Sequence, residues 1–161
     1  MMLGMTLSAF TLFHVVLSLI GIGSGLIVVF GLLAANRLKN WTAIFLLSTV
    51  ATSVTGFLFP FHGFKPSYAI GILSLILLVL AIVARYAFHL AGSWRWVYVV
   101  SAIVALYFNV FVAIVQSFMK VPALKSLAPT QSEPPFFVAQ LTVMAIFVAL
   151  GIFSVRRFRP L

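Results

Sequence analysis

The sequence predicts an all-α integral membrane protein, a bundle of five transmembrane helices with the N-terminus outside and the C-terminus in the cytoplasm. Of its 161 residues, 64% are hydrophobic and only 7% are charged, which is too few to give a soluble domain a polar exterior. The apolar residues fall into five runs, each near the roughly 20 residues that cross a bilayer. The ten Lys and Arg residues gather mostly at the ends of these runs, where charges reach the headgroups.

Each run is expected to form a helix, because only a helix satisfies its own backbone hydrogen bonds in lipid. The first run stops at a polar stretch around Arg37, the third at Gly92 and Ser93, and the fifth at the arginines near the end of the chain. A Pro-bearing loop, residues 121–135, precedes the fifth run. Residues 1–161 are therefore predicted to form a single transmembrane domain, with helices at about residues 8–35, 41–60, 67–91, 95–119 and 136–155.

The distribution of the basic residues predicts the orientation of this five-span chain in the membrane. One side collects seven of them: Arg37, Lys39, Arg85, Arg95, Arg156, Arg157 and Arg159. The other side collects Lys65, Lys120 and Lys125, together with Glu133, which is the only acidic side chain. The positive-inside rule therefore predicts an outside N-terminus and a cytoplasmic C-terminus. The expected location is a bacterial inner membrane, in which the protein is multi-pass.

The distribution of charge and the motifs that the sequence lacks exclude several classes of function. The formal net charge of +9 lies at segment ends rather than along one face or in a tail, so we expect the bilayer and its anionic lipids as partners, and no nucleic acid. The chain has no cysteine, which excludes disulfides, thiolate nucleophiles and Cys-ligated metals. No HExxH, GxSxG or P-loop motif is present, and one carboxylate excludes paired-acid catalysis within one chain. The sequence therefore favours a non-enzymatic protein.

Small and polar residues recur at helical spacing, which predicts that they face the bundle interior. Gly21 and Gly25 form a GxxxG pair in the first helix, and we interpret them as packing residues. Asn109 lies near the middle of the fourth helix, where an unpaired amide is costly. It is expected to hydrogen-bond to Ser48, Thr52 or Ser74, and the alternative is a polar step in a solute pathway.

The first candidate site is a lipid- or anion-binding patch on the inner side, formed by Arg85, His89 and Arg95. No acidic side chain on that side can neutralise Arg85, so its partner is a lipid phosphate, a backbone carbonyl, another subunit or an anionic ligand. Structural anchoring is the simpler interpretation. A phosphate site, in which arginine contributes a bidentate fork, is the alternative.

The second candidate site is a cofactor site on the outer side, formed by His14, His62, Gln116 and Gln140. The predicted topology gives these residues similar depth. Two histidines from different segments could be the axial ligands of a haem, and the same groups among Phe and Tyr could hold a quinone headgroup. The plain alternative is that each histidine makes an ordinary hydrogen bond, with His62 too far out in its loop to meet His14.

The leading functional hypothesis is an accessory or scaffold subunit that contacts other membrane proteins and anionic lipid. The first alternative is a haem- or quinone-binding redox protein built around His14 and His62. The second alternative is a small-solute permease. Ion-coupled transport is disfavoured, because no predicted span contains an acid or a break near its middle.

Overall fold

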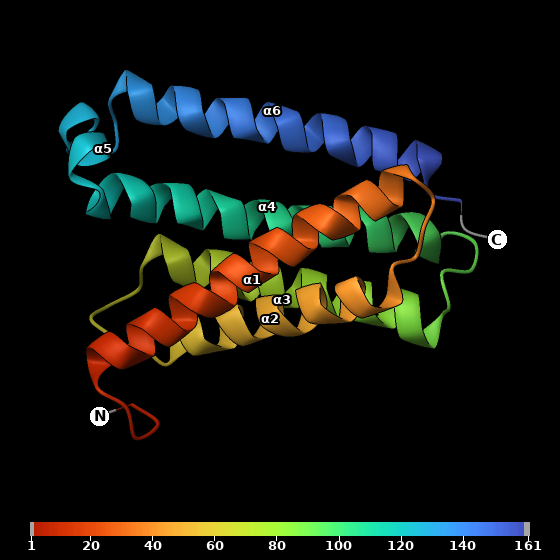
Figure 1. The fold of residues 1–161 in the computed structure, drawn as a ribbon, viewed down its shortest axis with the longest axis horizontal. Helices are drawn as coiled ribbons and strands as arrows, with labels where there is room; N and C mark the ends of the chain where they lie inside the picture. Colours follow the sequence, from red (N-terminus) through yellow and green to blue (C-terminus); the bar gives the residue numbers. More distant parts are fainter. Residues whose placement is uncertain (1, 160–161) are drawn as a thin grey trace.

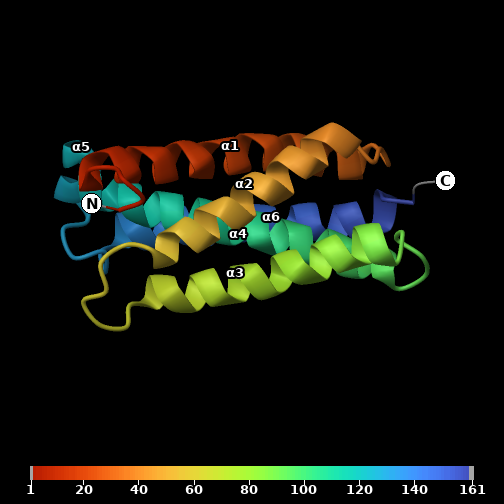
Figure 2. The same ribbon diagram turned by 90° about the horizontal axis from the view of Figure 1, so that it is seen from below.

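The computed structural model describes residues 2–159, and its long helices lie side by side along one axis (Figures 1 and 2). The long helices are α1 (Leu7–Leu33), α2 (Lys39–Phe57), α3 (Pro66–Ile82), α4 (Trp94–Lys120) and α6 (Pro134–Arg157). A π-helical turn, η1 (Val83–Ala87), extends α3, and the short helix α5 (Pro122–Leu127) lies in the loop before α6. The first turn of α1 and the last turn of α6 lie at opposite ends of the bundle (Figure 1).

Four helical segments are long and apolar enough to cross a membrane: α1, α3 together with η1, α4 and α6. The predictions of an all-helical chain and of a multi-pass membrane protein are confirmed at this level. The helix α2 is not among the four, because its apolar residues are interrupted by serines and threonines and it begins with Lys39 and Asn40. The fifth span and the orientation of the termini stay predictions.

The distribution of side chains on α2 is nevertheless the one that a lipid environment favours. Its buried side chains include Thr42, Ser48, Thr49 and Thr55, whereas Leu47 on the outward face is 72% exposed. Phe45 and Leu46 are buried as well, so it is the hydroxyls that depart from a helix on the surface of a soluble protein, where they would face outward. Helix α2 packs between α1 and α3 (Figure 2), and its 19 residues reach about 28 Å, close to the roughly 30 Å of a bilayer core.

The third helix ends differently from its prediction. The sequence predicts one helix over residues 67–91, but α3 ends at Ile82 and the π-helical turn η1 follows. His89 and Leu90 then adopt left-handed backbone conformations, with φ of 49° and 62°. The Leu90 N–H donates to the Ala84 carbonyl (2.9 Å), which closes the helix end. The helix therefore ends before Gly92, the residue expected to terminate it.

The hydrophobic core fills the half of the bundle that carries most of the basic residues. Its buried members include Leu78, Tyr98 and Leu106, from α3 and α4. Gly25 of α1 lies against this core, and a Cβ atom there would lie 2.6 Å from Leu106 Cδ1 and 3.0 Å from the Phe45 ring. The GxxxG pair is therefore a packing feature, as predicted.

Replacing Gly25 with alanine is expected to destabilise the bundle, because the added methyl group would push α1 away from α2 and α4. We expect Gly25→Ala to lower the free energy of unfolding in detergent by about 1–3 kcal/mol, the usual cost of overpacking. Gly23→Ala is the matched control, since Gly23 lies on the same helix and a Cβ there meets nothing within 4 Å. Equal unfolding free energies for the two variants would contradict the packing account.

Candidate functional site

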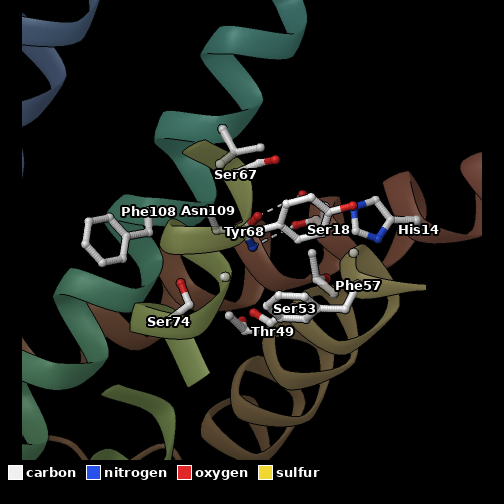
Figure 3. Close-up of a pocket in the computed structure, with 14 residues that line it drawn as sticks. His14, Ser18, Thr49, Ser53, Phe57, Ser67, Tyr68, Ser74, Phe108 and Asn109 are labelled. Atoms are coloured by element: carbon white, nitrogen blue, oxygen red, sulfur yellow. Dashed lines mark hydrogen bonds between the residues drawn. The ribbon is translucent and has the colours of Figure 1, made fainter. Parts of the chain in front are cut away.

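A cavity of about 120 Å³ lies inside the bundle between α1, α2, α3 and α4 (Figure 3). Most of its lining side chains are polar: His14, Ser18, Thr49, Thr52, Ser53, Ser67, Tyr68, Ser74 and Asn109. Phe57, Phe108 and Val112 supply the apolar part of the wall, and Gly56 and Gly71 complete it. No Asp, Glu, Lys or Arg is among the lining residues, so the cavity suits a neutral, hydrogen-bonding molecule.

The cavity occupies the half of the bundle opposite to the basic end. The lining residues that α2 and α3 contribute lie in the C-terminal half of α2 and the N-terminal half of α3. Asn109 lies about 22 Å along α4 from Trp94, which is beyond the middle of a bilayer core of about 30 Å. Toward the basic end, Tyr98 and Leu106 fill the space between the helices. The cavity is therefore closed on that side.

The amide of Asn109 joins α4 to α1 at the cavity wall. Ser18 Oγ donates to Asn109 Oδ1 (2.8 Å), and Asn109 Nδ2 donates to the Ser18 carbonyl (3.4 Å). The sequence predicts a partner on the second or third helix, and that prediction is wrong. The reason is Gly21, where a Cβ atom would lie 3.0 Å from Asn109 Nδ2 and 3.0 Å from Thr49 Oγ1. Because Gly21 has no side chain, α1 approaches closely enough for Ser18 to reach the amide.

His14 is held by α2 rather than by a second histidine. Its Nδ1 lies 2.7 Å from Thr55 Oγ1, and that hydroxyl donates to the Ala51 carbonyl at 2.7 Å. The Thr55 hydroxyl therefore accepts from His14, which assigns the proton of the neutral imidazole to Nδ1 and leaves Nε2 as an acceptor. Phe59 packs edge-on against the ring, with centroids 5.2 Å apart. The ring is thus held in one tautomer and one orientation.

Thr49 has a buried hydroxyl that makes no hydrogen bond within residues 2–159. The residue is 2% exposed, and its Oγ1 has no hydrogen-bond partner among the residues that the structure describes. Leaving a buried hydroxyl unpaired costs about 1–3 kcal/mol. Thr49 also lines the cavity wall (Figure 3), and its Oγ1 lies beside α1, where a Cβ atom at Gly21 would be 3.0 Å away.

Of the four predicted cofactor residues, only His14 lines the cavity. His62 is exposed in the loop between α2 and α3, and Gln116 is exposed on α4. Gln140 is buried on α6, where its Nε2 donates to the Phe111 carbonyl (3.3 Å). A haem bound by both histidines stays a prediction. No group of three or more His, Asp or Glu residues suited to a metal ion occurs within residues 2–159.

Sequence reasoning missed several residues of the wall, most importantly Thr49 and Tyr68. The signal for Thr49 is the unusual density of serine and threonine on α2, a pattern that helix packing alone also explains. Tyr68 gave no such signal, because its role depends on how α3 packs against α2. The rings of Tyr68 and Phe57 stack with centroids 5.7 Å apart. Together they form an aromatic surface on one side of the cavity.

The residues of the predicted anion patch lie at the basic end of the bundle, where both arginines bond to the protein itself. Arg85 is 8% exposed, and its Nη2 donates to the Arg37 carbonyl (2.8 Å) while its Nη1 donates to the Tyr98 hydroxyl (3.4 Å). Arg95 Nη1 donates to the Val155 carbonyl (2.9 Å) at the end of α6. Both guanidinium groups therefore bind backbone carbonyls, and His89 is exposed. An anion-binding role for the three residues stays a prediction.

The fold and the cavity define a small polytopic helical membrane protein with a neutral polar site inside its bundle. No protein-family model, curated protein or solved structure matches the chain. Its function is therefore inferred from the geometry of the site.

Removing the Arg85 guanidinium is expected to loosen the basic end, because this group connects the α1–α2 turn to α4. We expect Arg85→Leu to lower the free energy of unfolding by about 1–3 kcal/mol, as for the loss of hydrogen bonds made by a buried group. Arg157→Leu serves as the control, since Arg157 is exposed and changes at such positions usually stay within about 0.5 kcal/mol. A comparable loss in both variants would mean that Arg85 acts only through general charge.

Glu133, which precedes α6, should titrate below its ordinary pKa. Desolvation opposes ionisation, but hydrogen bonds from the Thr130 hydroxyl (2.8 Å), the Thr130 N–H (3.2 Å) and the Ser132 N–H (3.1 Å) outweigh it and lower the pKa of the Glu133 carboxyl. These bonds stabilise the loop above the ordinary pKa, and that stabilisation is lost as the pH falls through the lowered value. We expect Thr130→Ala to raise the pKa. Carbon NMR can follow it, because Glu133 is the only acidic side chain.

Proposed function

We propose that this small polytopic membrane protein is a non-enzymatic binding component that takes the neutral head of a membrane-soluble molecule into its cavity. A quinone ring is the chemical class that we propose. The observation that supports this proposal is the Thr49 hydroxyl, which belongs to a residue of the cavity wall and has no hydrogen-bond partner among the described residues. An unpaired donor beside an uncharged cavity favours a ligand that accepts hydrogen bonds.

Both redox states of a quinone find complementary groups on the wall. A quinone carbonyl accepts only, and the Thr49 hydroxyl is a donor without an acceptor among residues 2–159. A quinol hydroxyl donates, and Nε2 of His14 is an acceptor in the tautomer that carries its proton on Nδ1. The stacked pair of Phe57 and Tyr68 offers an aromatic surface against which a flat ring can pack. These residues would hold and orient the ring, and the redox chemistry would belong to the quinone.

The haem and permease hypotheses have less support from the geometry. A haem held by two histidines needs His62 beside His14, and His62 is exposed in its loop and absent from the cavity wall. A permease needs a path across the whole bundle, and the fully buried Tyr98 and nearly fully buried Leu106 stand between the cavity and the basic end. A binding site that is closed on its inner side accounts better for this arrangement.

An accessory role beside other membrane proteins, as expected from the sequence, is compatible with binding such a ligand. The exposure of α6 supports this accessory role, because the only buried side chains of the helix are Gln140, Phe147 and Ser154. The proposed setting is a bacterial inner membrane, with the basic end of the bundle in the cytoplasm. Co-purification of a constant membrane partner from mild detergent would establish the accessory role, and a solitary chain would count against it.

Thr49→Val should separate binding from stability. Valine has the shape of threonine without the hydroxyl, so we expect the ligand-free variant to be more stable by about 1 kcal/mol, because no unpaired hydroxyl remains. The same variant should lose most of the thermal stabilisation that a short-chain benzoquinone gives the wild-type protein in detergent. An unchanged quinone effect in Thr49→Val, or no effect in the wild type, would contradict the proposal.

Thr42→Val is the matched control, with the opposite expected pattern. Thr42 is also buried in α2, but its hydroxyl donates to the Arg37 carbonyl (3.1 Å), far from the cavity. We expect this variant to lose about 1 kcal/mol of stability, because a hydrogen bond is removed. Its stabilisation by the benzoquinone should match that of the wild type.

We further propose that α2 is the fifth span, which gives the termini opposite sides. The chain has no cysteine, so single introduced cysteines report their side without interference. We expect His62→Cys to react with a membrane-impermeant maleimide in intact cells, and Asn40→Cys to react only after permeabilisation. Both positions are exposed: Asn40 is the second residue of α2, and His62 follows the other end of the helix. Labelling of both from the same side would contradict the five-span topology, and the reverse pattern would overturn the orientation.

A further inference from the structure

We propose that a groove between α4 and α6 binds one anionic phospholipid, with an acyl chain along the groove and the phosphate at Arg156. This site is separate from the cavity, and it does not depend on what the cavity binds. The groove measures about 420 Å³. It exists because α6 packs at the edge of the bundle beside α4 (Figure 1) through a single stripe of buried residues.

The wall of the groove is almost entirely apolar. Val100 and Val104 of α4 face Met144, Val148 and Ile152 of α6 across it. Gly151 also lines it, and a Cβ atom at that position would meet only Ile103 Cγ2, at 3.9 Å. The missing side chain therefore leaves open space in the groove rather than permitting close helix packing. Such a surface accepts a flexible hydrocarbon chain without requiring any polar partner.

The length of the groove favours an acyl chain over a helix as its occupant. From Met144 to Arg156 the groove follows α6 for about 18 Å, at 1.5 Å per residue. One leaflet of a bilayer core accounts for about 15 Å, half of the full thickness. A transmembrane helix packed parallel to α6, from a partner or a second copy, would extend past Met144 across the full thickness. The groove matches a chain that runs from the headgroup level to the middle of the membrane.

The positive charge at the end of the groove favours a lipid with an anionic headgroup. Arg156 is the only charged residue that lines the groove, and it is exposed at the end nearest the membrane boundary. The only acidic side chain, Glu133, precedes α6 at its other end, so no protein carboxylate side chain can pair with Arg156. A guanidinium binds phosphate through two parallel hydrogen bonds. Trp96, one turn before Val100 on α4 and 48% exposed, is suited to the same headgroup level.

The first test measures lipid retention by native mass spectrometry, with the full chain in mild detergent and either phosphatidylglycerol or phosphatidylcholine added. We expect one retained phosphatidylglycerol per chain in preference to phosphatidylcholine. Arg156→Gln should weaken that retention roughly fivefold, the effect of one basic residue near an anionic headgroup. Arg157→Gln is the control, since Arg157 is a neighbouring exposed arginine that does not line the groove. Equal losses in the two variants would overturn the proposal in favour of general surface charge.

The second test fills the groove. Gly151→Leu should displace the retained phosphatidylglycerol, whereas Gly23→Leu, at an exposed glycine of α1 with open space around it, should retain it. Retention of phosphatidylglycerol by a folded Gly151→Leu variant would overturn the proposal. It would also be overturned if the wild-type chain forms dimers that Gly151→Leu dissociates, because the groove would then be an interface between copies.

Discussion

The close approach of α1 to α4 at Gly21 is the contact on which the rest of the structure depends. An asparagine deep in a bilayer must find a partner within the protein, since lipid offers none. Asn109 finds it in Ser18, and this pairing is geometrically available only because no side chain stands at Gly21. The same approach brings α1 to the Thr49 hydroxyl on α2. One glycine thus sets both the helix packing and the polar wall of the cavity.

The bilayer also explains why the hydrogen-bonding groups are concentrated inside. Helix α2 turns Ser48, Thr49 and Thr55 inward, so one half of the bundle interior is polar while the hydrophobic core fills the other half. Three hydroxyls of this helix, those of Ser48, Thr52 and Thr55, bond to a carbonyl of their own helix. The Thr49 hydroxyl makes no such bond within the described part of the chain, and this unpaired group at the cavity wall is the basis of the proposed binding function.

Sequence reasoning predicted the helical class and the approximate helix positions, because hydropathy and length report directly on the bilayer. It failed where the outcome depended on the relative placement of helices. The partner of Asn109 lies on α1 rather than on α2 or α3, and no spacing within α4 carries that information. The helical segment formed by α3 and η1 ends before left-handed conformations at His89 and Leu90, and a side chain such as leucine rarely adopts that conformation. His14 can be predicted as a site residue because a single histidine stands out in an apolar run. Thr49 cannot, because it is one of several serines and threonines in its run.

Hydrogen bonding between the Thr49 hydroxyl and a quinone can be measured from the infrared spectrum of a quinone with isotope-labelled carbonyls, recorded in the presence of the protein. A carbonyl that accepts a hydrogen bond absorbs at lower frequency than a free one. We expect a lowered carbonyl band with the wild-type protein and the return of that band to its position in lipid alone with Thr49→Val. A band at the free position with the wild-type protein would contradict the claim that the Thr49 hydroxyl awaits a neutral, hydrogen-bond-accepting ligand.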